Sequence, residues 1–238
     1  MPPPEPSSAK VISAATAGRR NRPKLDPDAG VRLKLLAAAS KIVQERGVGG
    51  LTIADLLARA ELGTRAFYRH FDSKDQLVQE VFLGMGRVEK VRLRGKMASA
   101  AGPLEAVAAW IDGRLDLVFD EAIRSDLRHL SREAQSQMFA APELVSPAYR
   151  EMLKPLIEQL VAGKERGIFP RIDPETDADL LHGAVWACVE AQWGVAVRDR
   201  QRIREATLYF CLGGLGVSRD RIAALINREC WNTIEHEE

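Results

Sequence analysis

Apolar residues recur at helical spacing along nearly the whole chain from Val31 onward, and no segment shows the strict alternation of a half-buried strand. The first clear stripe consists of Leu35, Leu36, Ala39, Ile42 and Val43. Helix stops and turn signals separate the apolar stretches, at Gly47, Gly102-Pro103, Ala141-Pro142, Gly167 and Pro170. The pattern therefore predicts an all-α protein of about nine helices.

The helices expected after the first one differ in length. Short helices are predicted from Thr52 to Ala60, from Thr64 to Phe71 and from Ser73 to about Gly86. Longer ones are predicted at 104–123, 127–139, 144–166, 176–197 and 203–217, with a last short piece to about Asn227. Pro147 and Pro155 lie inside the predicted 144–166 helix, so we expect that helix to begin later or to be kinked.

The composition is that of an ordinary globular protein, with 46% hydrophobic and 28% charged residues. No apolar run approaches the roughly 20 residues needed to span a bilayer, and the N-terminus lacks the apolar stretch of a signal peptide. We therefore expect a cytoplasmic protein with no membrane partner. The cysteines Cys188, Cys211 and Cys230 have no metal-ligand spacing and are expected to be reduced thiols, so no metal and no cofactor is predicted.

Residues 1–29 are rich in Pro, Ser, Ala and Gly and are predicted to form a flexible arm. The arm is basic, because its first 25 residues carry five basic side chains and one acidic one, whereas residues 26–80 carry eight of each. Such an end can bind a polyanion, although a solvated tail is the plain alternative. The basic side chains expected to reach an adjacent DNA minor groove are Arg19, Arg20, Arg22 and Lys24.

Residues 30–86 are predicted to form a DNA-binding domain built on a helix-turn-helix. Two short helices joined by the turn Glu61-Leu62-Gly63 can place the second helix in the DNA major groove. Phe67 and Phe71 are spaced to pack inward, which leaves four outward side chains with the chemistry of base contacts: Thr64, Arg65, Tyr68 and Arg69. Phosphate contacts are expected from Thr52, Tyr68, His70 and Lys74.

The residues of this segment resemble the TetR family of bacterial repressors. LLAAASKIVQERG, TIADLLARA and FYRHF followed by DSKDQL are similar to the N-terminal domain of that family, over about 50 residues from Val31 to Val81. The resemblance implies that Thr52, Tyr68, His70 and Lys74 contact phosphates and that Thr64, Arg65 and Arg69 contact bases. The turn departs from the usual pattern at two positions, because Glu61 replaces a glycine and Gly63 replaces a serine cap.

The resemblance also implies an effector-binding and dimerisation domain, expected here at residues 87–238. The family pairs its last two long helices across a homodimer, and the residues expected there are Leu181, Ala184, Val185, Cys188, Phe210, Leu212, Gly213, Gly214 and Leu215. The same residues could equally form the core of one chain. A small, mainly apolar effector is expected between the middle helices, near Trp110, Phe119, Met138, Phe139, Tyr149, Trp186 and Trp193. These aromatic residues could instead be plain core, as could His129 and His182.

The function predicted from these features is transcriptional repression. A dimer would bind a roughly palindromic double-stranded DNA operator and be released by the effector. No Gly-rich phosphate loop and no nucleophile beside a base is present, so the chain is not expected to be an enzyme. The alternative is a helical ligand-binding dimer that acts without DNA or through a protein partner.

Overall fold

The computed structural model describes residues 28–123, 125–193 and 199–234 of the chain, and this part is entirely helical. It contains ten α-helices and one short 3-10 turn, compared with the roughly nine helices expected, so the all-α prediction is confirmed. The helices are α1 (Ala29–Arg46), α2 (Ile53–Ala60), α3 (Thr64–His70), α4 (Lys74–Met97), α5 (Pro103–Phe119), α6 (Ser125–Ala140), α7 (Pro142–Glu165), α8 (Pro174–Gln192), α9 (Arg200–Gly214) and α10 (Arg219–Ile234). The 3-10 turn is η1 (Val48–Gly50).

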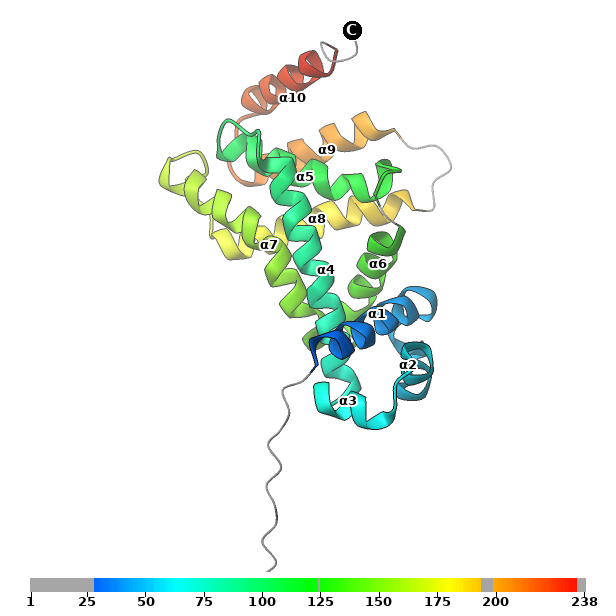
Figure 1. Cartoon of the computed structure of the whole chain (residues 1–238). Helices are drawn as coiled ribbons and strands as arrows, with labels where there is room; N and C mark the ends of the chain where they lie inside the picture. Colours follow the sequence, from blue (N-terminus) through cyan, green and yellow to red (C-terminus); the bar gives the residue numbers. More distant parts are fainter. Residues whose placement is uncertain (1–27, 124, 194–198, 235–238) are drawn as a thin grey trace, which may run out of the picture.

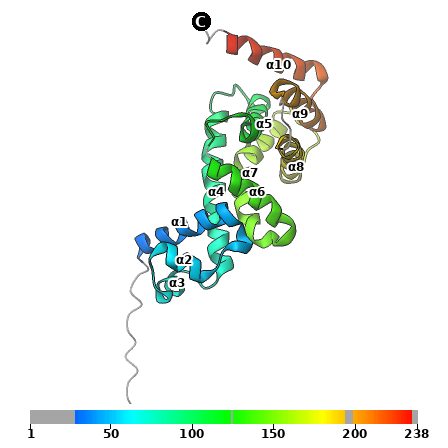
Figure 2. The same ribbon diagram turned by 90° about the vertical axis from the view of Figure 1, so that its right-hand side faces the viewer.

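Helices α1 to α3 form one end of the molecule, and α4 runs from this end through the larger helical body (Figure 1). Helix α7 runs alongside α4, helices α5, α8 and α9 lie around the far half of α4, and α10 lies at the opposite end from α3 (Figures 1 and 2). One continuous hydrophobic core includes Phe67 at the first end and Leu208 in the body. A change in the packing of the body can therefore reach the three N-terminal helices through contiguous side chains.

Helix α4 continues to Met97, so the expected end near Gly86 was wrong. The reason is visible at Glu89, which is fully buried at a position where an apolar residue would continue the stripe. Arg92 and Arg114 compensate the Glu89 carboxylate, and the sequence pattern alone does not show this. The expected boundary between residues 86 and 87 falls inside this helix and stays a prediction.

Helix α7 begins at Pro142, and both internal prolines lie within it, so the expected later start was wrong. Pro147 has no N–H to donate to the carbonyl of Glu143 four residues earlier. Gln79 of α4 donates its Nε2 to that carbonyl oxygen at 3.1 Å. The missing helical hydrogen bond is thus replaced by one that ties α7 to the first turns of α4.

Close packing of α4 on α7 depends on Gly86, because a Cβ atom there would lie 2.5 Å from the carbonyl oxygen of Ala148. At that distance the two helices would have to move apart.

Among the described residues, no helix is long and apolar enough to cross a membrane.

Candidate DNA-binding interface and effector site

Helix α3 presents one buried face and one exposed face. Phe67 and Phe71 are almost fully buried, with ring centroids 5.9 Å apart, and they anchor the helix and its end on the core. The exposed face carries all four side chains predicted to contact bases: Thr64, Arg65, Tyr68 and Arg69. The structure therefore brings these four together on one solvent-facing surface, and their contact with bases stays a prediction.

The two arginines of this surface differ from other arginines of the same end of the molecule. Arg59 forms two hydrogen bonds with the Glu45 carboxylate, at 2.7 and 2.9 Å. Arg46 pairs with Asp55 at 3.2 Å, and Arg32 pairs with Glu80 at 3.2 Å. Within the part of the chain that the structure describes, Arg65 and Arg69 have no carboxylate partner. Their guanidinium groups are free to bind an external acceptor.

The predicted phosphate contacts lie at helix ends around α3. The Thr52 hydroxyl caps α2 by accepting from the Asp55 N–H at 3.1 Å, and Ser73 caps α4 by accepting from the Gln76 N–H at 3.1 Å. Lys74, which is partly buried, is the first residue of α4. The positive ends of both helices thus lie next to side chains that can bind anions.

His70 and the N-terminal arm fit the predicted interface less directly. His70 is the last residue of α3 and is only partly exposed, and its Nδ1 atom is buried without a hydrogen-bond partner among the described residues. The arm residues Arg19, Arg20, Arg22 and Lys24 lie outside the residues that the structure describes. Their contact with a minor groove therefore stays a prediction.

Glu61 occupies a backbone conformation that favours glycine, with φ 54° and ψ 44° in the left-handed region. The turn is a Schellman motif, because the N–H of Leu62 donates to the Leu57 carbonyl at 3.0 Å and the N–H of Glu61 to that of Ala58 at 3.3 Å. Gly63 caps α3 without a side-chain hydrogen bond. The two departures noted in the sequence leave the turn intact, and Glu61 stores backbone strain there.

Four of the residues expected near an effector come together in the body. Trp110 of α5, Tyr149 of α7 and Trp186 of α8 surround His182, with ring centroids 6.4, 5.0 and 6.4 Å from its ring. Trp193, the C-terminal cap of α8, contacts Trp186 at 5.1 Å. We call these five residues the His182 cluster.

Charge and burial define the chemistry of the His182 cluster. Burial lowers the pKa of His182 to about 3, with a further contribution from the Arg114 charge, so its imidazole is neutral near pH 7. Burial also raises the pKa of Tyr149 to about 12, and its hydroxyl bonds to Gln135 Oε1 at 2.8 Å. Arg114 was not among the predicted site residues, because an arginine in an apolar helix pattern gives no sign of which side chains surround it.

The remaining expected effector residues lie elsewhere. Phe119 and Met138 are partly buried against the core but make no ring contact with the His182 cluster. Phe139 is 87% exposed, so the structure does not place it in an interior site. His129 is also exposed.

A separate groove of about 760 Å3 lies between α1, α4 and the start of α6. Its walls are mostly apolar and include Leu36, Met85 and Leu127. None of the expected effector residues lines it. The groove lies where the DNA-binding end meets the body, and its volume is in the range of cavities that bind small molecules.

The residues expected at a dimer interface divide into two groups. One group is buried within this chain, so the alternative that the residues form the core of one chain holds for its members: Leu181, Val185, Leu212 and Leu215. Phe210 is 74% exposed, and Gly213 and Gly214 are exposed beside it in sequence. Leu180, which was not among the expected interface residues, is 65% exposed on α8. Ala184 and Cys188 are partly buried.

Cys188 and Cys211 are free thiols, and burial raises the pKa of Cys211 to about 12, with a further contribution from Cys188. No group of His, Cys, Asp or Glu that could hold a metal occurs among the described residues.

An exposed second helix of a helix-turn-helix, attached to a larger helical body, defines a DNA-binding regulator. Residues 35–81 match the model of the family described as bacterial regulatory proteins, tetR family. Over these residues the chain is similar to the TetR family of transcriptional regulators.

The chain aligns with two curated relatives over most of their length. The transcriptional repressor KstR2 of Mycobacterium tuberculosis (strain CDC 1551 / Oshkosh) is 24% identical over 77% of this chain and 92% of KstR2. The repressor DhaR of Mycobacterium sp. (strain GP1) is 26% identical over 63% of this chain and 76% of DhaR.

Solved structures show the same fold. RolR in complex with resorcinol has a TM-score of 0.61 and 19% identity, covering 84% of this chain and 94% of RolR. AibR in complex with isovaleryl coenzyme A and operator DNA has a TM-score of 0.54 and 15% identity, covering 76% of this chain and 97% of AibR. These likenesses concern the fold alone.

Proposed function

We propose that the chain is a cytoplasmic repressor that binds a roughly palindromic double-stranded DNA operator as a homodimer and is released by a small, mainly apolar effector. The observation that carries the proposal is the pair of unpartnered arginines on α3. Arg65 and Arg69 are exposed beside Thr64 and Tyr68, whereas Arg32, Arg46 and Arg59 are held by carboxylates. Arginine donates two hydrogen bonds to guanine O6 and N7, which makes this surface suited to base readout.

Homodimer formation is supported by exposed apolar surface on α8 and α9. Leu180 and Phe210 are mostly exposed, and Gly213 and Gly214 permit close approach of a second helix. Pairing of these two helices with those of a second copy would bury this surface and present two α3 helices to successive major grooves.

The effector site is proposed at the His182 cluster. Its rings come from α5, α7 and α8, and each of these helices belongs to the core that reaches the DNA-binding end. A ligand that binds one arrangement of the helices more tightly shifts the population toward it, and repression ends if that arrangement no longer fits the operator. The proposal assigns the chain no enzymatic activity.

Selection of binding sites from a random DNA pool, followed by mobility shift on the enriched sequence, tests the proposed repressor function. We expect enrichment of an inverted repeat and binding that weakens steeply as salt increases, because phosphate contacts release counterions. Failure to enrich any sequence would contradict the repressor function and favour a ligand-binding dimer that acts without DNA.

A further inference from the structure

Three side-chain nitrogens inside the His182 cluster are buried without a hydrogen-bond partner. They are Trp110 Nε1, Trp186 Nε1 and His182 Nδ1. Trp110 is fully buried and Trp186 is 4% exposed, so both indole nitrogens lie away from the surface. Of the six such atoms among the described side chains, half belong to this one cluster, so the lack of partners is concentrated here.

Buried polar groups in folded proteins are nearly always hydrogen-bonded, and each one left unpaired lowers the stability of the folded state. Two indoles that both lie within ring-contact distance of His182, with all three nitrogens unpaired, therefore indicate that an acceptor from outside the chain completes the site. Both indole nitrogens can only donate. The neutral His182 imidazole can donate from one nitrogen as well.

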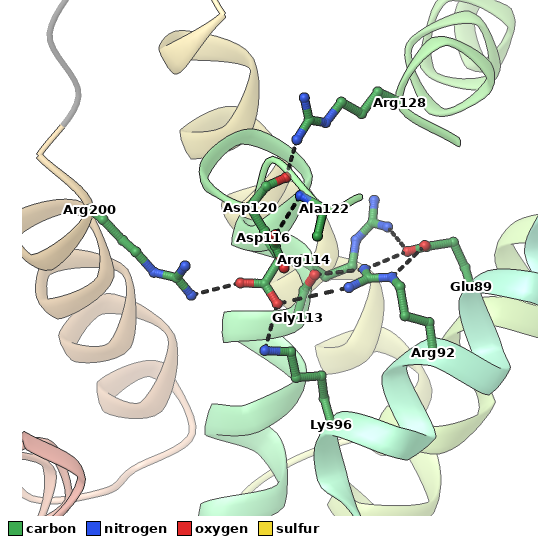
Figure 3. A network of polar contacts seen from close by, with 10 residues as sticks. All are labelled: Glu89, Arg92, Lys96, Gly113, Arg114, Asp116, Asp120, Ala122, Arg128 and Arg200. Carbon is green, nitrogen blue, oxygen red and sulfur yellow. Dashed lines mark hydrogen bonds and ion pairs between the residues drawn. The ribbon is translucent and has the colours of Figure 1, made fainter. Parts of the chain in front are cut away.

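An excess of positive charge lies next to these donors. Glu89 is shared by two guanidinium groups, since Arg114 donates to its Oε2 at 2.6 Å and Arg92 donates to both oxygens at 2.9 and 3.0 Å. Asp116 pairs with Lys96 at 2.9 Å and with Arg200 at 2.6 Å. Figure 3 shows these two carboxylates facing four cations, and Arg114 is the cation that also lies 5.9 Å from the Trp186 ring.

The ionisation of Glu89 depends on the charges of Arg92 and Arg114 next to it. Burial by itself raises the pKa of Glu89, but the Arg114 and Arg92 charges and hydrogen bonds outweigh burial and hold that pKa below its ordinary value. Glu89 is therefore ionised near pH 7 and neutralises one of its two arginines. Arg92 also pairs with Asp116 at 3.9 Å, so the excess belongs to the whole network of four cations and two carboxylates, and it attracts an anion toward the His182 cluster.

We propose that the His182 cluster binds a small cyclic or aromatic carboxylic acid, whose carboxylate accepts hydrogen bonds from the Trp110 and Trp186 indoles beside Arg114. The ring of the ligand would pack on the aromatic side chains, as an apolar body does in most ligand sites. This inference rests on the proposed function, which places an effector in this domain, and it adds that the effector is an anion.

Indole 15N–1H spectra of the full chain test the proposal, because each tryptophan gives its own signal. Benzoate is the probe, and benzyl alcohol and benzylamine are its neutral and cationic counterparts of similar size. Trp110→Phe and Trp186→Phe assign the two signals and remove one donor each while keeping an aromatic ring. Trp231→Phe is the matched control, because Trp231 lies on α10, outside the His182 cluster.

We expect benzoate to shift the Trp110 and Trp186 signals and to bind roughly tenfold more tightly than benzyl alcohol, since hydrogen bonds to a charged acceptor are the stronger ones. Trp110→Phe and Trp186→Phe should each weaken benzoate binding several-fold, and Trp231→Phe should leave it unchanged. Absence of a benzoate shift, or equal binding of benzyl alcohol or benzylamine, would overturn the proposal.

The titration uses no DNA, so its result is independent of operator binding. If the protein binds its operator but does not bind benzoate, the proposed acid-binding site is wrong and the DNA-binding function still holds. If the protein binds benzoate at the two indoles but enriches no DNA sequence, the ligand site is supported and the proposed repressor function is wrong.

Discussion

The backbone N–H of Val48 donates to Glu133 Oε1 at 2.9 Å, and this hydrogen bond joins the turn after α1 to helix α6. Gln137 donates to the same oxygen at 3.1 Å, which fixes the carboxylate in place. The contact connects the DNA-binding end with the body at a point separate from the long α4 helix. It is therefore a place where movement of α6 reaches the end of the molecule that carries α3.

Glu133→Ala should lower the free energy of unfolding by about 1–2 kcal/mol, because it leaves the Val48 N–H without its acceptor. Glu133→Gln keeps a carbonyl oxygen in the same place and should stay close to the wild type. Urea denaturation of the three proteins measures the difference. Equal loss in both variants would show that charge, and not the hydrogen bond to Val48, is what matters at this position.

Glu61→Gly should raise the free energy of unfolding by about 1 kcal/mol, because glycine adopts the left-handed conformation without a Cβ clash. Glu61→Ala removes the same carboxylate but keeps the Cβ atom, so it should bring no such gain. Thermal or urea unfolding of both variants separates backbone strain from charge. A gain in Glu61→Ala equal to that in Glu61→Gly would contradict the strain at Glu61.

Acid should destabilise the protein in part through His182. The folded-state pKa of about 3 lies below the ordinary value of 6.5, so only the unfolded chain takes up this proton between those two pH values. The contribution of His182 to stability is complete above pH 6.5 and is lost as pH falls toward 3, by up to about 1.4 kcal/mol per pH unit.

Substitution of His182 by Asn removes this titration, so unfolding free energies measured from pH 7 to pH 4 should fall less steeply than in the wild type. His129→Asn is the control, because it removes an exposed imidazole without disturbing the buried cluster. A wild-type slope in the His182→Asn protein would show that His182 is not held neutral by its surroundings.

Leu180→Glu and Phe210→Glu should convert a dimer into a monomer, because each places a charge on the exposed apolar surface of α8 or α9. Sedimentation measurements report the mass directly. Val88→Glu is the matched control, since Val88 is 59% exposed but lies on α4. Dimers that persist in both α8 and α9 variants, or that dissociate in Val88→Glu, would place the interface elsewhere.

Local signals in the sequence predicted the DNA-binding end well. Caps at Thr52 and Ser73 and the inward spacing of Phe67 and Phe71 depend on neighbours a few residues apart, so the sequence alone is enough to identify them. The length of α4 could not be predicted in this way, because the buried Glu89 is stabilised by Arg114, which is 25 residues away in sequence.

The body was predicted less completely for the same physical reason. Apolar spacing identifies a helix face but not its partner, so the sequence left open whether Leu181 and Leu212 face a second copy or the core of one chain, and they pack inside the chain. Phe210 was expected at the interface and is exposed, whereas the exposed Leu180 became apparent only from the arrangement of α8 and α9. Convergence of Trp110, Tyr149 and Trp186 on His182 likewise depends on three helices meeting in space.

Fluorescence anisotropy tests most directly whether α3 reads the operator. It measures the binding of the Arg65→Ala and Arg69→Ala variants to the selected operator. Arg171→Ala is the control, because it removes an exposed positive charge located between α7 and α8. We expect each α3 variant to lose about 1–3 kcal/mol of binding free energy and to discriminate less between the operator and altered sequences. Wild-type affinity and sequence preference in both α3 variants would contradict the assignment of α3 as the helix that reads the operator.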